Sequence, residues 1–285
     1  MTFAQDSVKP AKMTAEEVVA KHLASIGTPE NLAASKTRFY VGEVTKQDTA
    51  SAANPPKSAP AQFATDGRQL MMAMIFDDGT ESVAFNGEEQ TLDFPKKNPL
   101  GEFFKVKKQL TKNGFLGGAL STAWPLLNLK AADIRLDYVG MTEAAGRKYH
   151  HLRYWPSVGQ ITVNLFFDAQ SFRHVTSEYI YNGDGSGFIK ADGKGEVHKL
   201  VEVFSDFKKA GNLILPMHYT LRRSDDDFNL SVSITPSTYR GLPAEVNSDM
   251  KVSPGKQILS YTISFKEIYL NESLDQTIFK ISKKP

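Results

Sequence analysis

The sequence predicts a mainly β fold with a few helices (α+β), built on a single large, curved antiparallel sheet. From about residue 134 onward, apolar residues recur at every second position, which is the period of a half-buried strand. Helical spacing appears in only two places, near the N-terminus and over residues 99–129. Because few of the roughly ten expected strands are joined by helices, neighbouring strands should run antiparallel.

The N-terminal helix has clear boundary signals. Thr14 can cap it, and Glu17, three residues later, completes a capping box. Apolar residues within 18–26 keep helical spacing, and Gly27 with Pro29 should end the helix.

Strands are expected immediately after this helix. Residues 37–45 form the first, and the small-residue, Pro-rich stretch 49–60 is typical of a mobile hairpin tip. Residues 69–76 are apolar on both faces, and residues 81–85 follow after a turn. Asn86-Gly87 predicts the next turn.

Three later rows alternate with polar residues and predict further strands. They are Ile161, Val163, Leu165 and Phe167; Leu213, Leu215, Met217, Tyr219 and Leu221; and Leu259, Tyr261, Ile263 and Phe265. Asp225-Asp226-Asp227 is interpreted as a solvated hairpin tip after a strand that ends at Arg223.

The helical segment 99–129 is a basic amphipathic insert, broken by glycines and by Pro125. Its apolar stripe is Leu100, Phe103, Phe104 and Leu110, and its lysines are Lys105, Lys107, Lys108 and Lys112. Two interpretations stay open. The insert packs on the sheet with its lysines in water, or it is a lid with lysines near an anionic head group or a membrane surface.

A curved sheet must cover its apolar concave face, and the N-terminal helix and the insert are the available covers. Where they fit loosely, an apolar ligand cavity results. The predicted lining comes from three strand rows and the insert. These candidate ligand-binding residues are Leu70, Met72, Met74, Phe76, Phe103, Phe104, Leu165, Phe167, Met217 and Tyr219.

Composition excludes several kinds of site. The 285 residues include no cysteine, which rules out thiolate nucleophiles, Cys-ligated metals and disulfides. The 34 Lys and Arg against 32 Asp and Glu leave a net charge of +2, which argues against nucleic acid as the main partner. No run of residues approaches the roughly 20 apolar positions of a membrane-spanning helix.

No motif predicts catalysis, a metal site or a cofactor. The stretch 182–193 echoes a calcium loop, but Gly193 stands where the bidentate Glu belongs, and a Gly-rich hairpin loop explains it as well. His150 and His151 are adjacent on a strand and should point to opposite faces. No nucleotide fingerprint and no nucleophile elbow occur.

The chain is expected to form one domain over residues 14–285, preceded by a disordered or processed segment, 1–13. Thr2-Phe3-Ala4 resembles the end of a signal peptide with cleavage before Gln5. On this tripeptide alone, a cytosolic chain and an exported chain are both open.

Three stretches resemble a known family. Residues 14–27, running on to 37–42, resemble the opening helix and first strand of exported lipoprotein-sorting proteins. Residues 204–216 are similar to their "aromatic-x-D…G-x-x-L-P" strand pair, and 271–279 resemble their closing "N-x-x-L-D-x-x-x-F". Together the motifs resemble the lipoprotein-sorting (LolA/LolB-like) superfamily, over nearly the whole chain.

The resemblance implies an open half-barrel whose concave face is plugged by helices, with a helical lid at about 99–129. It also implies a periplasmic or otherwise exported carrier of a lipid, an acylated protein or another hydrophobic ligand, which acts as a monomer without catalysis or cofactor. The alternative is an accessory or structural subunit with a solid core that docks on an envelope-protein partner. A hydrolase would require a cleft that gathers scattered polar residues.

Overall fold

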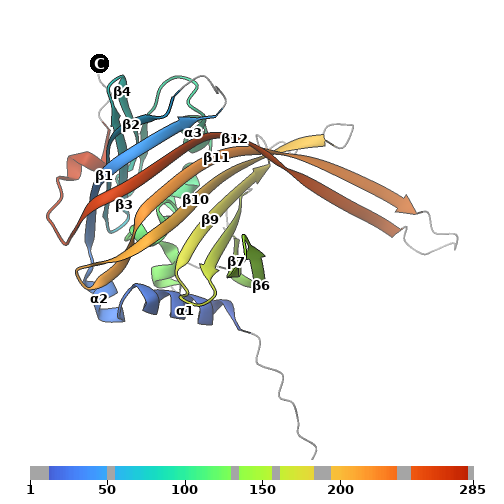
Figure 1. The fold of residues 1–285 in the computed structure, drawn as a ribbon, viewed down its shortest axis with the longest axis horizontal. Helices are drawn as coiled ribbons and strands as arrows, with labels where there is room; N and C mark the ends of the chain where they lie inside the picture. Colours follow the sequence, from blue (N-terminus) through green and yellow to red (C-terminus); the bar gives the residue numbers. More distant parts are fainter. Residues whose placement is uncertain are drawn as a thin grey trace, which may run out of the picture.

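A computed structural model of the chain describes residues 13–49, 55–129, 135–155, 161–182, 194–235 and 245–281. It contains one twelve-stranded antiparallel sheet with helices packed against it (Figure 1). The strands are β1 (Thr37–Asp48), β2 (Lys57–Asp66), β3 (Gln69–Phe76), β4 (Gly79–Phe85), β5 (Gln90–Asp93), β6 (Arg135–Ala144), β7 (Arg147–Trp155), β8 (Ile161–Asp168), β9 (His174–Asn182), β10 (Lys194–Ala210), β11 (Leu213–Thr235) and β12 (Glu245–Leu270). The helices are α1 (Ala15–Ile26), α2 (Pro29–Ala34), α3 (Pro99–Val106) and α4 (Lys108–Lys112), and the 3-10 turns are η1 (Gly118–Leu120), η2 (Pro125–Asn128) and η3 (Gln276–Phe279).

The strand order explains where the insert lies. The order is β5-β4-β3-β2-β1-β12-β11-β10-β9-β8-β7-β6, so the first and last strands pair at the centre. Strands that follow one another in the chain are neighbours, except that β5 and β6 stand at opposite edges of the sheet. The chain between them must therefore cross from one edge to the other. That crossing segment holds α3, α4, η1 and η2.

The predicted boundaries of the first helix are confirmed. The Thr14 hydroxyl accepts a hydrogen bond from the Glu17 amide, and the Glu17 carboxylate accepts one from the Thr14 amide. Gly27 follows the last residue of α1 and caps it. The helical conformation, however, does not stop at Pro29, as the sequence predicted. Thr28 caps a second short helix, α2, in which Pro29 takes the first position, where its missing N–H costs nothing.

Two strand predictions need correction. Residues 57–60 belong to β2, where Pro60 lies opposite Glu43, and not to a loop. Asp225-Asp226-Asp227 is not a hairpin tip, because β11 continues through it to Thr235 and pairs with β12. The apolar alternation that resumes after the aspartates extends the strand and outweighs the preference of Asp for turns.

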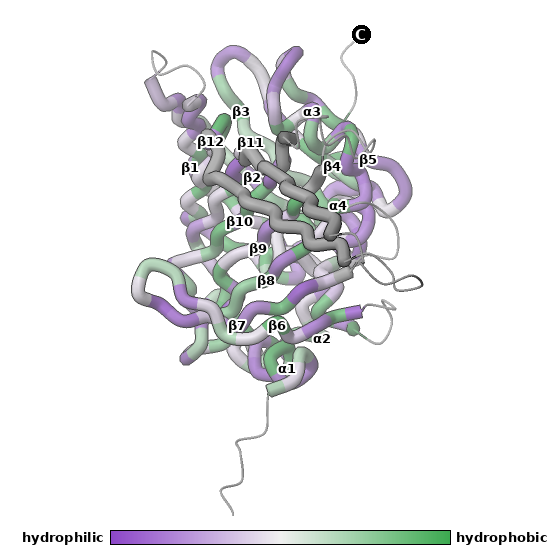
Figure 2. Tube along the Cα trace, turned by 90° about the vertical axis from the view of Figure 1, so that its right-hand side faces the viewer, coloured by the Kyte–Doolittle hydropathy of each residue, from purple (hydrophilic) through white to green (hydrophobic). Residues whose placement is uncertain are grey.

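The fold class is confirmed: the sheet is curved and unclosed, and helices cover one of its faces. α1 packs against β6 and β11, while η1 of the insert contacts β9 and β11. Figure 2 shows hydrophobic and hydrophilic residues interleaved along the strands, which is the pattern of a sheet with one covered face. The main hydrophobic core lies between this concave face, α1 and the insert.

A smaller core lies on the opposite, convex face. There the segment after β12 packs across β3 and β4 through η3. Phe279 is fully buried in this cluster, together with Ala64, Met71 and Ala84. The C-terminal segment is therefore part of the fold.

Removing the Phe279 ring should destabilise the whole domain. Phe279→Ala leaves a cavity in the convex core and should lower the free energy of unfolding by about 3–5 kcal/mol. Urea unfolding followed by circular dichroism measures the change. Val139→Ala is the control, since Val139 is 46% exposed, and it should alter stability by no more than about 0.5 kcal/mol. Equal effects of the two substitutions would contradict a structural role for the C-terminal segment.

Candidate functional site

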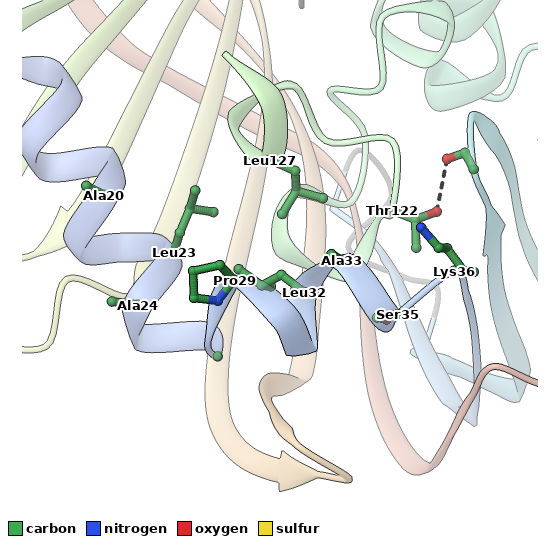
Figure 3. Close-up of a pocket in the computed structure, with 12 residues that line it drawn as sticks. Ala20, Leu23, Ala24, Pro29, Leu32, Ala33, Ser35, Lys36, Thr122 and Leu127 are labelled. Carbon is green, nitrogen blue, oxygen red and sulfur yellow. Dashed lines mark hydrogen bonds between the residues drawn. The ribbon is translucent and has the colours of Figure 1, made fainter. Parts of the chain in front are cut away.

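A pocket of about 580 Å³ lies between the two N-terminal helices and the insert (Figure 3). Its apolar wall consists of Ala20, Leu23, Ala24, Gly27, Pro29, Leu32, Ala33 and Leu127. Its polar or open part consists of Ser35, Lys36, Gly67 and Thr122. A recess of this size with few polar groups is typical of small-molecule sites.

The local sequence explains the shape of this pocket. Three of the lining residues are alanines, whose short side chains leave space beside Leu23 and Leu32. The bend between α1 and α2 sits directly on β11, because a Cβ at Gly27 would lie 2.7 Å from a methyl of Leu213. A side chain at Gly27 would therefore force the Leu213 side chain to shift.

The polar end of the pocket is built by the start of β1 and the β2–β3 turn. The Thr122 hydroxyl donates a hydrogen bond to the Gly67 carbonyl over 3.0 Å and ties the insert to that turn. The Lys36 amide donates to Asn271 Oδ1 over 2.8 Å, which holds the backbone of Lys36 in place. Of the described lining residues, Lys36 is the one with an ionisable side chain.

Arg38 stands behind this end of the pocket. Its side chain is buried, with Nε donating to Ser35 Oγ over 2.9 Å and Nη1 donating to the Ala119 carbonyl over 2.6 Å. No carboxylate among the described residues pairs with it. Beside it, Tyr40 Oη donates to the Leu120 carbonyl over 2.9 Å. Both side chains therefore bind the backbone of η1.

A second group of sheet side chains holds the insert through a buried carboxylate. Glu202 of β10 accepts hydrogen bonds from the Gly117 amide at 2.7 Å and from Tyr219 Oη at 2.6 Å, and its Oε2 lies 2.6 Å from Tyr179 Oη. Gly117 has φ of +86°, and a Cβ there would lie 2.4 Å from the Phe63 ring. Only glycine can bring this amide to the carboxylate.

The hydrogen-bond count favours the protonated form of Glu202. Tyr179 Oη has one proton but faces two acceptors, the Phe115 carbonyl at 2.9 Å and Glu202 Oε2. Both contacts are satisfied when Glu202 donates to Tyr179 and Tyr179 donates to Phe115. Burial raises the pKa of Glu202 to about 7, in agreement with this arrangement.

The other end of the insert is held in a similar way. Tyr261 Oη donates to Glu81 Oε2 at 2.5 Å, and Asn98 Nδ2 donates to Tyr261 Oη at 3.0 Å. Asn98 also caps α3 through the Leu100 amide. Lys46 neutralises Glu81 over 2.5 Å. Burial and the Glu81 carboxylate together raise the pKa of Tyr261 far above its usual value.

Aromatic and imidazole rings fill the space between α1 and the insert. Trp124 stacks on His174 with ring centroids 4.8 Å apart, and His22 lies 5.1 Å from Trp124. His22 Nδ1 bonds the Phe172 carbonyl over 2.9 Å. Burial lowers the pKa of His22 to about 4 and holds that of His174 well below its usual value, so both rings are neutral near pH 7.

The structure brings all ten sequence-predicted lining residues into the main core. Leu70, Met72, Met74, Phe76, Phe103, Phe104, Leu165, Phe167 and Tyr219 are buried there, and Met217 packs against it partly buried. They share a face with α1 and the insert. They do not line the pocket in Figure 3, so their role as a ligand surface stays a prediction that requires the insert to move.

Other sequence predictions have mixed outcomes. Lys105, Lys108 and Lys112 are exposed, which leaves both interpretations of the basic insert open. His150 bonds Tyr138 and His151 bonds Asn164, on opposite faces of β7 as expected. The calcium-like stretch from Gly183 onward lies outside the described residues, as does the leader-like tripeptide.

Within the described ranges, no helix is long and apolar enough to cross a membrane. The same residues contain no group of three or more His, Cys, Asp or Glu side chains that could hold a metal ion.

Sequence reasoning missed the buried charged residues. The sequence contains a sign that Glu202 is buried. In β10 it occupies the same face as the apolar residues Leu200 and Phe204, two positions away on either side. Arg38 likewise shares a face of β1 with Tyr40. A charged residue at an apolar-face position indicates a buried polar contact.

No protein-family model matches the chain, and none of the curated proteins is similar to it. Among solved structures, it is similar to a LolA superfamily protein from Nitrosomonas europaea, with a TM-score of 0.48 and 11% identity over 94% of this chain and 98% of that one. A domain assigned to outer membrane lipoprotein sorting, from Vibrio parahaemolyticus, has a TM-score of 0.48 and 11% identity over 93% and 95%. A DUF1329 family protein from Desulfovibrio piger has a TM-score of 0.45 and 8% identity over 92% and 95%.

Glu202 should make the protein less stable as the pH rises. Its pKa is about 7 in the folded protein against 4.5 for an unburied Glu, so the folded state binds more protons between these values. This stabilisation is complete below about pH 4.5 and is lost as the pH rises through about 7, a change on the order of 3 kcal/mol. Glu202→Gln cannot ionise and should remove this dependence. Urea unfolding across the range tests it, and an unchanged pH profile in the variant would contradict the assignment.

His22 should make the protein less stable as the pH falls. Its pKa is about 4 when folded and 6.5 when exposed, so the unfolded state binds more protons in between. Stability is therefore lost as the pH falls from about 6.5 towards 4. His22→Asn should make this acid-side loss shallower, with His174 supplying the remainder. An equally steep acid-side loss of stability in His22→Asn would contradict this assignment.

Proposed function

We propose that the protein is a non-enzymatic, exported binder or carrier of an amphiphile with a hydrocarbon chain, such as a lipid or an acylated protein. The observation that carries this proposal is the apolar pocket of about 580 Å³ between α1, α2 and the insert. It has a hydrophobic wall and a polar end. A chain bound there gains about 0.8 kcal/mol for each CH₂ removed from water.

The arrangement of titratable groups supports binding over catalysis. Three acid–base groups with strongly shifted pKa values, Glu202, His22 and His174, are buried at the insert. The pocket itself presents Lys36 beside hydroxyl groups and lacks an acid–base pair among its described lining residues. Chemistry on a bound ligand would need such a pair within hydrogen-bond reach.

The insert gives the carrier a way to enlarge its pocket. It is joined to the sheet by separate polar contacts at Arg38, Tyr40, Tyr179, Glu202 and Tyr261. Movement of the insert would expose the ten predicted lining residues to a longer chain or a second one. Lid motions of this kind occur on microsecond to millisecond timescales.

A second candidate function is an accessory subunit of an envelope complex. The packing of the concave face favours it, because the ten predicted lining residues form a solid core in this conformation. A groove of about 640 Å³ on the convex face, between β12 and the C-terminal segment, would offer a docking surface.

Mass spectrometry of the protein purified from its own host under native conditions tests the carrier function. A carrier should release lipid on denaturation, and Ala24→Trp should reduce the amount by narrowing the pocket without touching the core. Ala144→Trp, at the exposed end of β6, is the matched control. A lipid-free monomer, or a stoichiometric protein complex without lipid, would overturn the carrier proposal, and the complex would support the second candidate.

A further inference from the structure

The guanidinium of Arg38 is buried and pairs with no carboxylate among the described residues. Its side chain is 1% exposed, and arginine remains protonated at any physiological pH. Its hydrogen-bond partners among the described residues, Ser35 Oγ and the Ala119 carbonyl, are both neutral. Full burial of an arginine is rare without a paired anion, because desolvation of an ion costs several kcal/mol.

Arg38 lies directly behind the polar end of the pocket. Ser35, which accepts its Nε–H, is itself a lining residue, and Ala119 belongs to the insert segment that continues to the lining residue Thr122. A positive charge in a poorly solvated wall acts over a longer range than the same charge in water. The pocket is therefore electropositive at this end.

Lys36 adds a second positive charge at the same place. It lines the pocket, is solvent-exposed and forms no ion pair with any carboxylate in the described part of the chain. Arg38 follows it by two residues, a spacing of about 7 Å in extended chain. No acidic residue is among the described lining residues to offset the two cations.

From this arrangement we infer that the pocket selects amphiphiles with an anionic head, a carboxylate or a phosphate, which Lys36 binds at the mouth while Arg38 supplies a fixed positive field. The inference rests on the proposed function and names its ligand class. The hydrocarbon chain lies against Leu23, Leu32 and Leu127, and the head lies beside Ser35 and Thr122. The missing counter-charge of Arg38 is then supplied by the ligand.

Binding of four compounds with the same dodecyl chain tests the head-group preference. Laurate, dodecyl phosphate, dodecanol and dodecylamine are titrated into delipidated protein below their micelle concentrations, with calorimetry as the readout. The two anions should bind roughly tenfold more tightly than dodecanol, and dodecylamine more weakly than dodecanol. Comparison of laurate with dodecyl phosphate distinguishes a fatty acid from a phospholipid-type head.

Charge variants locate the effect. Lys36→Gln should weaken anion binding about 3- to 10-fold and leave dodecanol unchanged, and Lys36→Glu should reverse the order of laurate and dodecylamine. Lys57→Gln, at an exposed lysine paired with Asp78, is the matched control and should change nothing. Arg38→Gln should weaken anion binding further, and the Lys36 variants suffice if that protein does not fold.

The outcomes separate this inference from the proposed function. Equal affinity for laurate and dodecanol, or tighter binding of dodecylamine, would overturn the head-group selection and leave the carrier function standing. Failure of all four compounds to bind would overturn both.

Discussion

The structure depends on hydrogen bonds between buried side chains of the sheet and the irregular backbone of the insert. Residues 114–121 are buried but form no long helix or strand that would pair all of their backbone groups. A buried carbonyl or amide without a partner costs about 1–3 kcal/mol. Arg38, Tyr40, Tyr179 and Glu202 supply those partners. The sheet therefore stabilises the segment that covers it.

This constraint follows from the strand order. Because β5 and β6 are opposite edges of the sheet, the chain between them has to cross the concave face. The same crossing segment contributes to both the pocket and the core. Leu127 lines the pocket, and Trp124 is buried in the core. Binding and stability are thus coupled through the same residues, and a ligand that displaces the insert must replace its contacts.

Two of the buried ionisable groups at the insert, Glu202 and His22, favour their uncharged forms. Glu202 prefers its neutral, protonated form and His22 its neutral, unprotonated form, both because burial disfavours charge. The interface between insert and sheet is consequently best satisfied at mildly acidic to neutral pH. Arg38 is the exception, since it cannot lose its proton. Its persistent charge beside the pocket distinguishes this corner of the interface from the rest.

Periodicity and capping are local signals, so the sequence predicts the fold class, the capped helix α1 and the antiparallel pairing of the strands. It also identified residues 99–129 as a cover for the concave face. The position of the pocket at the α1–α2 bend depends on long-range packing, as does the burial of Arg38 and Glu202 at the insert. Those features arise from contacts between segments more than eighty residues apart, such as the contact of Glu202 with Gly117. A local sequence pattern does not show which distant segments come into contact. The three aspartates at 225–227 were misjudged for the same reason, since pairing with β12 decides their conformation.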